Sequence, residues 1–178
     1  EIKSMLSSKT FKVFSSHDTQ GVELAGALKN IYAICCGIAH AKLVGENALG
    51  FIVTRSMAEM SRFAVAKGAD PITFLGLAGM GDLMATCTSK LSRNFQLGEL
   101  IAEDFSLIDA KEKVGQVAEG ARTLEVVYHE ANKMNVSMPL VNSLYKILYS
   151  DSSSDQLIKD LLDHPNEVDV EFTYKKEK

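Results

Sequence analysis

The chain contains the stretch Gly21-Val-Glu-Leu-Ala-Gly-Ala-Leu-Lys29-Asn30-Ile-Tyr-Ala-Ile-Cys-Cys-Gly-Ile-Ala-His-Ala41, which is apolar on nearly every face of a helix. Glu23, Lys29 and Asn30 interrupt the apolar pattern. A helix that is apolar all round is buried inside a protein rather than laid on its surface. The stretch therefore predicts a helix at the centre of the fold.

The rest of the 178 residues also favours helix over strand, because Pro is scarce and Ala, Leu, Met, Glu and Lys recur. The length is sufficient for one sizeable domain with its own core. We expect an all-α, multi-helix bundle with a charged connector over 104–116 and a polar tail over 168–178. Further helices are predicted over 47–67, from Asp70-Pro71, over 92–103, 120–133 and 139–149, and from the Ser152–Asp155 cluster to Pro165.

Residues 1–20 do not match this pattern. Residues 1–8 could end a helix, residues 11–14 alternate like a short strand, and residues 15–20 form a polar connector. One helical turn and one strand cannot fold alone. We expect residues 1–20 to be the trailing edge of a preceding domain, and residues 21–178 to be the helical domain.

Composition excludes several classes of partner. The net charge is -4, and no basic face is dense enough for nucleic acid. The three Cys and four His lack the spacing of metal ligands, so no metal site is expected, and reduced thiols are typical of a cytoplasmic protein. We expect no signal peptide. The longest strongly apolar stretch, Ile31–Ala39, is far short of the roughly 20 residues that span a bilayer.

A second informative segment runs from Gly76 to Asn94. Gly76, Gly79 and Gly81 lead into Asp82, and hydroxyl residues lead into Ser92-Arg93-Asn94 before a new helical pattern. An Arg at a helix start, beside amides that favour anions, suits a phosphate group. The alternative is a surface loop followed by an ordinary N-cap. The glycines run G-x-x-G-x-G after no strand, so they are not a dinucleotide loop, and no G-x-G-x-x-G occurs in the chain.

Lys29 lies in the middle of the most apolar helix, where a cation is costly to bury unless it is paired or faces a cavity. Such a lysine could give and take a proton, or it could extend its head to the surface. Asn30 could bond a substrate oxygen or neighbouring backbone. Asp82 could hold Lys29, bind a substrate hydroxyl, or cap the helix that follows, and Thr86 lies one turn later on the same face.

Five motifs occur in a fixed order, and together they resemble bacterial NAD(P)-dependent glycerol-3-phosphate dehydrogenase. They are Gly21-Val-Glu-Leu-Ala-Gly-Ala-Leu-Lys29-Asn30, Gly79-Met-Gly-Asp82-Leu, Thr86-Cys-Thr-Ser, Ser92-Arg93-Asn94 and Val117-Ala-Glu119-Gly120. The similarity extends from about Phe11 to about Leu162.

The resemblance implies a cytoplasmic, two-domain enzyme whose product serves glycerophospholipid synthesis. It also allows a homodimer. An N-terminal Rossmann domain would hold NAD or NADP. A helical domain like the C-terminal domain of 6-phosphogluconate dehydrogenase would complete the active site. This chain would be that helical domain, preceded by the last helix and strand of the Rossmann domain, and would be inactive alone.

The resemblance also implies residue roles. Lys29 would be the general acid/base that protonates the carbonyl oxygen of dihydroxyacetone phosphate, a phosphorylated three-carbon substrate. The residues that would orient the substrate are Asn30, Asp82 and Thr86; those that would hold its phosphate are Ser92, Arg93 and Asn94; those that would contact the cofactor are Arg93, Val117 and Glu119. Ala25 and Glu46 depart from the family's usual Gly and Asp, at positions with no chemical role.

Two other functions fit the residues less well. A related dehydrogenase could act on another hydroxy substrate, but Ser92-Arg93-Asn94 favours a phosphorylated one. A helical interaction or dimerisation module without catalysis would give Lys29 no role.

Overall fold

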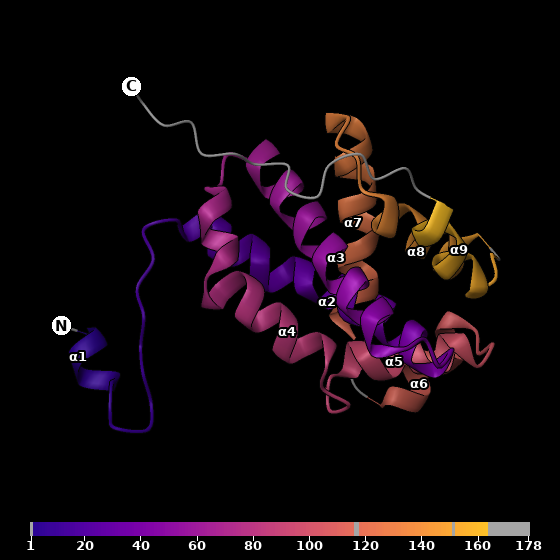
Figure 1. The fold of residues 1–178 in the computed structure, drawn as a ribbon, viewed down its shortest axis with the longest axis horizontal. Helices are drawn as coiled ribbons and strands as arrows, with labels where there is room; N and C mark the ends of the chain where they lie inside the picture. The colour runs from indigo at the N-terminus through magenta and orange to yellow at the C-terminus, as the bar shows by residue number, and fades with distance from the viewer. Residues whose placement is uncertain (1, 116–117, 151, 164–178) are drawn as a thin grey trace.

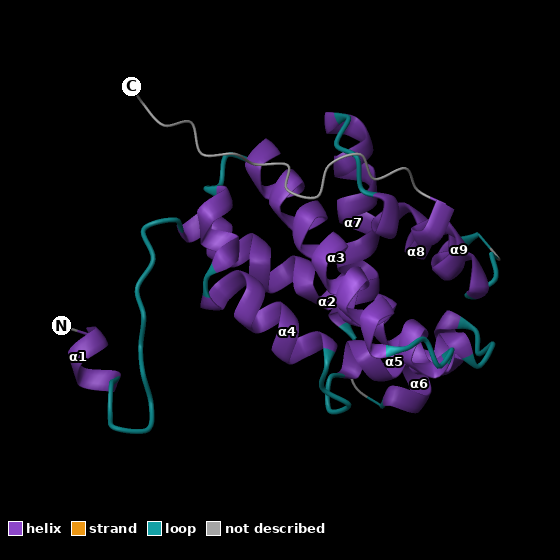
Figure 2. Cartoon of the chain, in the orientation of Figure 1, coloured by secondary structure: helices purple, strands orange, loops and turns teal. Residues whose placement is uncertain are grey.

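The computed structural model describes residues 2–115, 118–150 and 152–163, the last three without their side chains, and every regular element among them is helical (Figures 1 and 2). The predicted all-α bundle is therefore confirmed. The elements are α1 (Ile2–Leu6), α2 (Thr19–Ala41), α3 (Glu46–Ala66), η1 (Pro71–Leu75), η2 (Leu77–Gly81), α4 (Asp82–Cys87), α5 (Arg93–Ala102), α6 (Leu107–Val114), α7 (Glu119–Met134), α8 (Pro139–Tyr149) and α9 (Asp155–Asp163).

Helix α2 is the centre of the bundle, as its sequence predicts. It packs against α3, α4, α5 and α7, and residues 31–39 are all buried. By length and composition alone α2 could cross a membrane, so the shortness of Ile31–Ala39 is not a sufficient reason to exclude a span. The better reason is that 61% of its most apolar window is buried inside the protein. Its apolar surface is already covered by neighbouring helices, as in the core helix of a globular domain.

Helices α2 and α5 are in direct contact, and two glycines allow this contact. A Cβ atom on Gly37 would overlap the carbonyl oxygen of Phe95, and one on Gly98 would overlap the carbonyl oxygen of Ile34. The two backbones therefore touch directly. This contact places the N-terminus of α5 beside the middle of α2.

Glu59 on α3 is a buried carboxyl group that caps another helix. Its Oε1 accepts a hydrogen bond from the Leu140 amide at 2.5 Å, and its Oε2 accepts from Val141 at 3.3 Å and from the Tyr32 hydroxyl at 3.2 Å. The Leu140 and Val141 amides belong to the first turn of α8, whose N-cap residue makes no side-chain cap. Burial raises the pKa of Glu59 to about 7, although these hydrogen bonds oppose the shift.

We expect the free energy of unfolding to depend on the titration of Glu59. Its pKa is raised above the unfolded value of 4.5, so the folded state retains the proton longer than the unfolded state. This contribution is fully present below about pH 4.5 and is lost as pH rises through about 7, by a total of roughly 3 kcal/mol. Urea unfolding of the wild type and Glu59→Gln at pH 5 and pH 7.5 measures it. The wild type should lose more stability than the variant, and an equal loss in both would contradict the assignment.

Several predicted boundaries are confirmed. Ser92 caps α5 by accepting a hydrogen bond from the Phe95 amide, Pro139 begins α8, and α7 ends at Asn135, which has a φ of 56°. Asp70 caps η1 through the Ile72 amide. Pro165 and the tail over 168–178 lie outside the described residues.

Other predicted boundaries are wrong. The connector over 104–116 contains α6, which Ser106 caps and Gly115, with a φ of 68°, ends. The sequence pattern does not predict this helix, because only Ala110 of this short, charged helix is buried. Helix α3 begins after Gly45, which makes no side-chain cap, rather than at a capping Asn47.

Residues 11–14 form no strand: the Phe11 carbonyl accepts a backbone hydrogen bond from the nearby Ser8 amide at 2.7 Å, and no second extended segment among the described residues pairs with them. Figure 1 shows α1 set apart from the bundle and joined to α2 by an extended segment. The division into residues 1–20 and 21–178 stays a prediction.

Candidate functional site

A pocket of about 420 Å³ lies between α2, α4, the start of α5 and the start of α7. It brings together residues far apart in sequence, including most of those predicted to form a site. Asp82 adjoins it through its contact with Lys29, and Val117 lies outside the described residues. The residues that line the pocket are Lys29, Asn30, Ala85, Thr86, Ser89, Leu91, Ser92, Arg93, Asn94 and Glu119.

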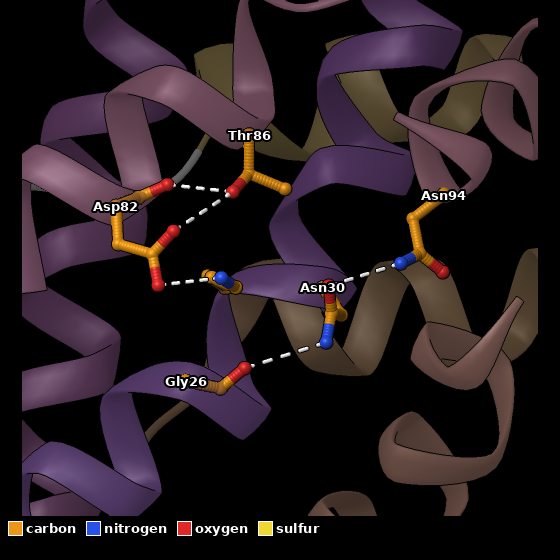
Figure 3. Close-up of polar contacts among 6 residues, drawn as sticks. Gly26, Asn30, Asp82, Thr86 and Asn94 are labelled. Atoms are coloured by element: carbon orange, nitrogen blue, oxygen red, sulfur yellow. Dashed lines mark hydrogen bonds and ion pairs between the residues drawn. The ribbon is translucent and has the colours of Figure 1, made fainter. Parts of the chain in front are cut away.

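Lys29 is paired within the pocket. Its Nζ donates a hydrogen bond to Asp82 Oδ2 at 2.5 Å, with 22% of the lysine side chain and 38% of the aspartate side chain exposed (Figure 3). Of the two alternatives for this lysine, the structure has the paired cation at a cavity rather than one extended into solvent. An ammonium held in this way is available to a ligand in the pocket as both a charge and a proton donor.

Thr86 fixes Asp82. Its hydroxyl donates to the Asp82 backbone oxygen at 2.6 Å and lies 3.5 Å from Asp82 Oδ1, so the two side chains share one face of α4 (Figure 3). Of the alternatives for Asp82, the structure has the contact with Lys29 and not the helix cap. The cap position is Gly81, and the Asp82 carboxylate accepts a hydrogen bond from Lys29.

Of the glycines before Asp82, Gly79 serves close packing. Residues 77–81 form a π-helical turn, and a Cβ on Gly79 would overlap the backbone of Phe74 in η1. The glycine thereby lets η2 lie directly on η1, which sets where α4 begins.

The part of the pocket lined by the start of α5 suits an anion. Ser92 and Arg93 start α5, a helix of ten residues, and Arg93 is exposed at the pocket edge. The first turn of a helix carries amide groups without intrahelical partners and the positive end of the helix dipole. A guanidinium beside them adds planar donors that match phosphate oxygens.

Asn30 and Asn94, which both line the pocket, connect three helices. Asn94 is 8% exposed, its Nδ2 donates to Asn30 Oδ1 at 3.0 Å, and its Oδ1 accepts from the Gly120 amide at 2.9 Å. Asn30 Nδ2 in turn donates to the Gly26 carbonyl at 3.3 Å (Figure 3). Sequence reasoning selected both asparagines but missed Gly120 as their partner, as well as Ser89 and Leu91 of the pocket lining.

The three thiols lie outside the pocket lining. Cys35, Cys36 and Cys87 are buried and free, and burial raises the pKa of Cys35 well above its ordinary value. Among the described residues, no three His, Cys, Asp or Glu side chains are grouped to hold a metal ion. The groups at hand in the pocket are therefore an ammonium, carboxylates, a guanidinium, amides and hydroxyls.

Comparison with known proteins gives a consistent picture. The family model for the C-terminus of NAD-dependent glycerol-3-phosphate dehydrogenase matches residues 18–159. The chain is 50% identical over 171 residues to glycerol-3-phosphate dehydrogenase [NAD(P)+] of Alcanivorax borkumensis and 47% identical over 172 residues to that of Pseudomonas putida. These matches cover 96% and 97% of this chain and 50% of each relative, so the chain spans about half the length of the curated relatives it matches.

A solved structure of the same family has the same fold. Glycerol-3-phosphate dehydrogenase from Coxiella burnetii superposes with a TM-score of 0.87 at 36% identity, over 92% of this chain and 50% of that one. The sequence motifs, the helical fold and the extent of the family match all agree. The chain belongs to the NAD-dependent glycerol-3-phosphate dehydrogenase family, whose C-terminal domain it matches.

Proposed function

We propose that this chain is the substrate-binding half of a cytoplasmic enzyme that reduces dihydroxyacetone phosphate to sn-glycerol 3-phosphate with NADH or NADPH. The observation that carries the proposal is that one pocket is lined both by Lys29, which is paired with Asp82, and by Arg93, at the N-terminus of a ten-residue helix. A small ketone phosphate needs these two groups, one at its carbonyl oxygen and one at its phosphate.

Lys29 acts at the carbonyl end. Reduction of a ketone places negative charge on the carbonyl oxygen, and the Lys29 ammonium stabilises that charge and donates a proton to the same oxygen. In the reverse direction, Lys29 takes the proton from the substrate hydroxyl. Asp82 holds the ammonium in place, and Thr86 holds Asp82.

The start of α5 acts at the phosphate end. Arg93 pairs with the phosphate oxygens, and the amides of the first helical turn donate to them. Ser92 lines the same part of the pocket, where its hydroxyl caps the helix. Asn94 also lines the pocket, and its side-chain amide connects α5 to α2 and α7.

The described residues fit only one edge of a cofactor site. Glu119 begins α7 and lines the pocket together with Arg93, and both would contact the nicotinamide cofactor from this side. When bound, that cofactor supplies the hydride of the reaction. Residues 2–115, 118–150 and 152–163 contain no strand with a glycine-rich turn for its phosphates. We infer that a Rossmann domain provides those contacts and expect the 178 residues alone to show no turnover.

Replacing Arg93 tests the proposal. In the full-length enzyme, Arg93→Ala should raise the KM for dihydroxyacetone phosphate by roughly a hundredfold, because a charge-assisted, bidentate phosphate contact is lost. Arg93→Lys should restore only part of the affinity, since an ammonium is a point charge without the planar fork. Steady-state kinetics measures both. An unchanged KM in Arg93→Ala would show that the phosphate binds elsewhere.

A further inference from the structure

The side chains of Asn30 and Asn94 and the backbone amide of Gly120 form a continuous set of hydrogen bonds, which we name the amide bridge. It runs from the Gly120 amide on α7 to Asn94 Oδ1, from Asn94 Nδ2 on α5 to Asn30 Oδ1, and from Asn30 Nδ2 to the Gly26 carbonyl on α2. Figure 3 shows Asn94 and Asn30 facing each other, with Gly26 at the far end. Three helices are therefore connected by two side chains.

The orientation of both side-chain amides is fixed by backbone groups at the two ends of the bridge. The Gly120 N–H can only donate, so it requires the oxygen of Asn94 to face it, and the Gly26 carbonyl can only accept, so it requires the nitrogen of Asn30. Neither asparagine can be rotated by 180° without placing two donors or two acceptors together. The bridge therefore has one arrangement.

Gly120 leaves no room for a side chain. A Cβ atom there would lie 2.5 Å from the Asn30 carbonyl oxygen and 2.7 Å from Asn94 Oδ1. The first of these neighbours is backbone and cannot move without shifting α2. The absence of a side chain at residue 120 thus allows α7 to approach both asparagines.

Two members of the bridge, Asn30 and Asn94, line the pocket themselves, and each of the three members also follows another lining residue in the sequence. Asn30 follows Lys29, Asn94 follows Arg93, and Gly120 follows Glu119. The bridge consequently links the lysine end of the pocket, the start of α5 and the start of α7. Asn94 is nearly buried, so water competes little for these hydrogen bonds.

We propose that the amide bridge sets the distance between the Lys29 ammonium and the N-terminus of α5, so that Gly120 and Asn94 are positioning residues of the substrate pocket. The inference rests on the proposed function, because it concerns how the carbonyl and phosphate ends of one substrate are held at a fixed separation. Gly120 does not line the pocket and acts through Asn30 and Asn94.

The test is Gly120→Ala in the full-length enzyme, with Ala131→Gly as the matched control. Ala131 is also buried on α7 but belongs neither to the bridge nor to the pocket, so its replacement loosens the same helix without touching the site. Both variants should lower the melting temperature. Gly120→Ala alone should lower kcat/KM for dihydroxyacetone phosphate, by roughly a hundredfold, because a small displacement of reacting groups has that effect. Equal kinetics in the two folded variants would overturn the inference.

Hydrogen exchange of the unmodified enzyme tests the bridge if Gly120→Ala does not fold. Glycerol 3-phosphate should slow exchange of the Gly120 amide several-fold more than that of the Ala131 amide, because a phosphate at α5 restricts Asn94. Equal slowing of the two amides would overturn the inference. Failure of the wild type to bind glycerol 3-phosphate would instead overturn the proposed function, and the inference with it. If the wild type binds glycerol 3-phosphate and Arg93→Ala does not, the result would support the proposed function independently of the bridge.

Discussion

Lys29→Met in the full-length enzyme is expected to lower kcat by roughly a thousandfold or more, because the variant loses both the proton donor and the charge at the carbonyl oxygen. Methionine has a similar length and no charge, and it can lie among the apolar residues of α2. The partner it leaves, Asp82, has 38% of its side chain exposed, so water can solvate the carboxylate and the fold should be kept. Steady-state turnover and thermal unfolding measure the two effects separately.

Lys29→Arg is the control that separates charge from proton transfer. A guanidinium keeps the positive charge beside Asp82 but remains protonated at any working pH, so it cannot serve as an acid and base. We expect this variant to bind the substrate but to turn over nearly as slowly as Lys29→Met. Activity of Lys29→Met within tenfold of the wild type would exclude the lysine as the acid–base group.

Gly98→Ala is expected to destabilise the protein by about 3 kcal/mol, since overpacking of a tight core contact has a cost of this order. The added Cβ would overlap the Ile34 carbonyl oxygen and would lie within 3.0 Å of the Ile38 amide, both on α2. These are backbone atoms of the central helix, so the strain cannot be relieved by a change of rotamer. The helices must move apart instead.

Gly50→Ala is the matched control, because the same substitution should have the opposite sign. Gly50 is exposed in the second turn of α3, and a Cβ there would have no neighbour within 4 Å. Alanine in an exposed helix interior is more favourable than glycine by about 1 kcal/mol. Denaturant unfolding of both variants compares them. A loss of under 0.5 kcal/mol (on the order of a surface substitution) in Gly98→Ala would contradict the direct backbone contact of α2 and α5.

Sequence patterns predicted those features of the fold that depend on residues close together in the chain. The apolar stretch of α2, the capping Ser92 and the initiating Pro139 each depend on neighbours a few residues away, and each prediction is confirmed. The short helix α6 was missed because only one of its residues is buried. The π-helical turn at Gly79 was missed because it depends on packing against Phe74.

The site required contacts over long sequence separations. Lys29 and Asp82 are 53 residues apart, and Asn30 and Asn94 are 64 apart. The sequence raised the pairing of Lys29 with Asp82 only as one of several alternatives, because no local rule places α4 beside α2. Glu59 gave one usable signal that was overlooked: it is a carboxyl residue between buried positions of an apolar helix face, next to Met60 and near Phe63. Such a residue needs a buried hydrogen-bond partner.

A structure of the full-length enzyme with glycerol 3-phosphate tests the central claim most directly. We expect the phosphate to lie within hydrogen-bond distance of the Arg93 guanidinium and the α5 amides, and the C2 hydroxyl to lie within hydrogen-bond distance of Lys29 Nζ. Glycerol 3-phosphate bound outside this pocket, or in it with the phosphate at Lys29 and the hydroxyl at Arg93, would contradict the account.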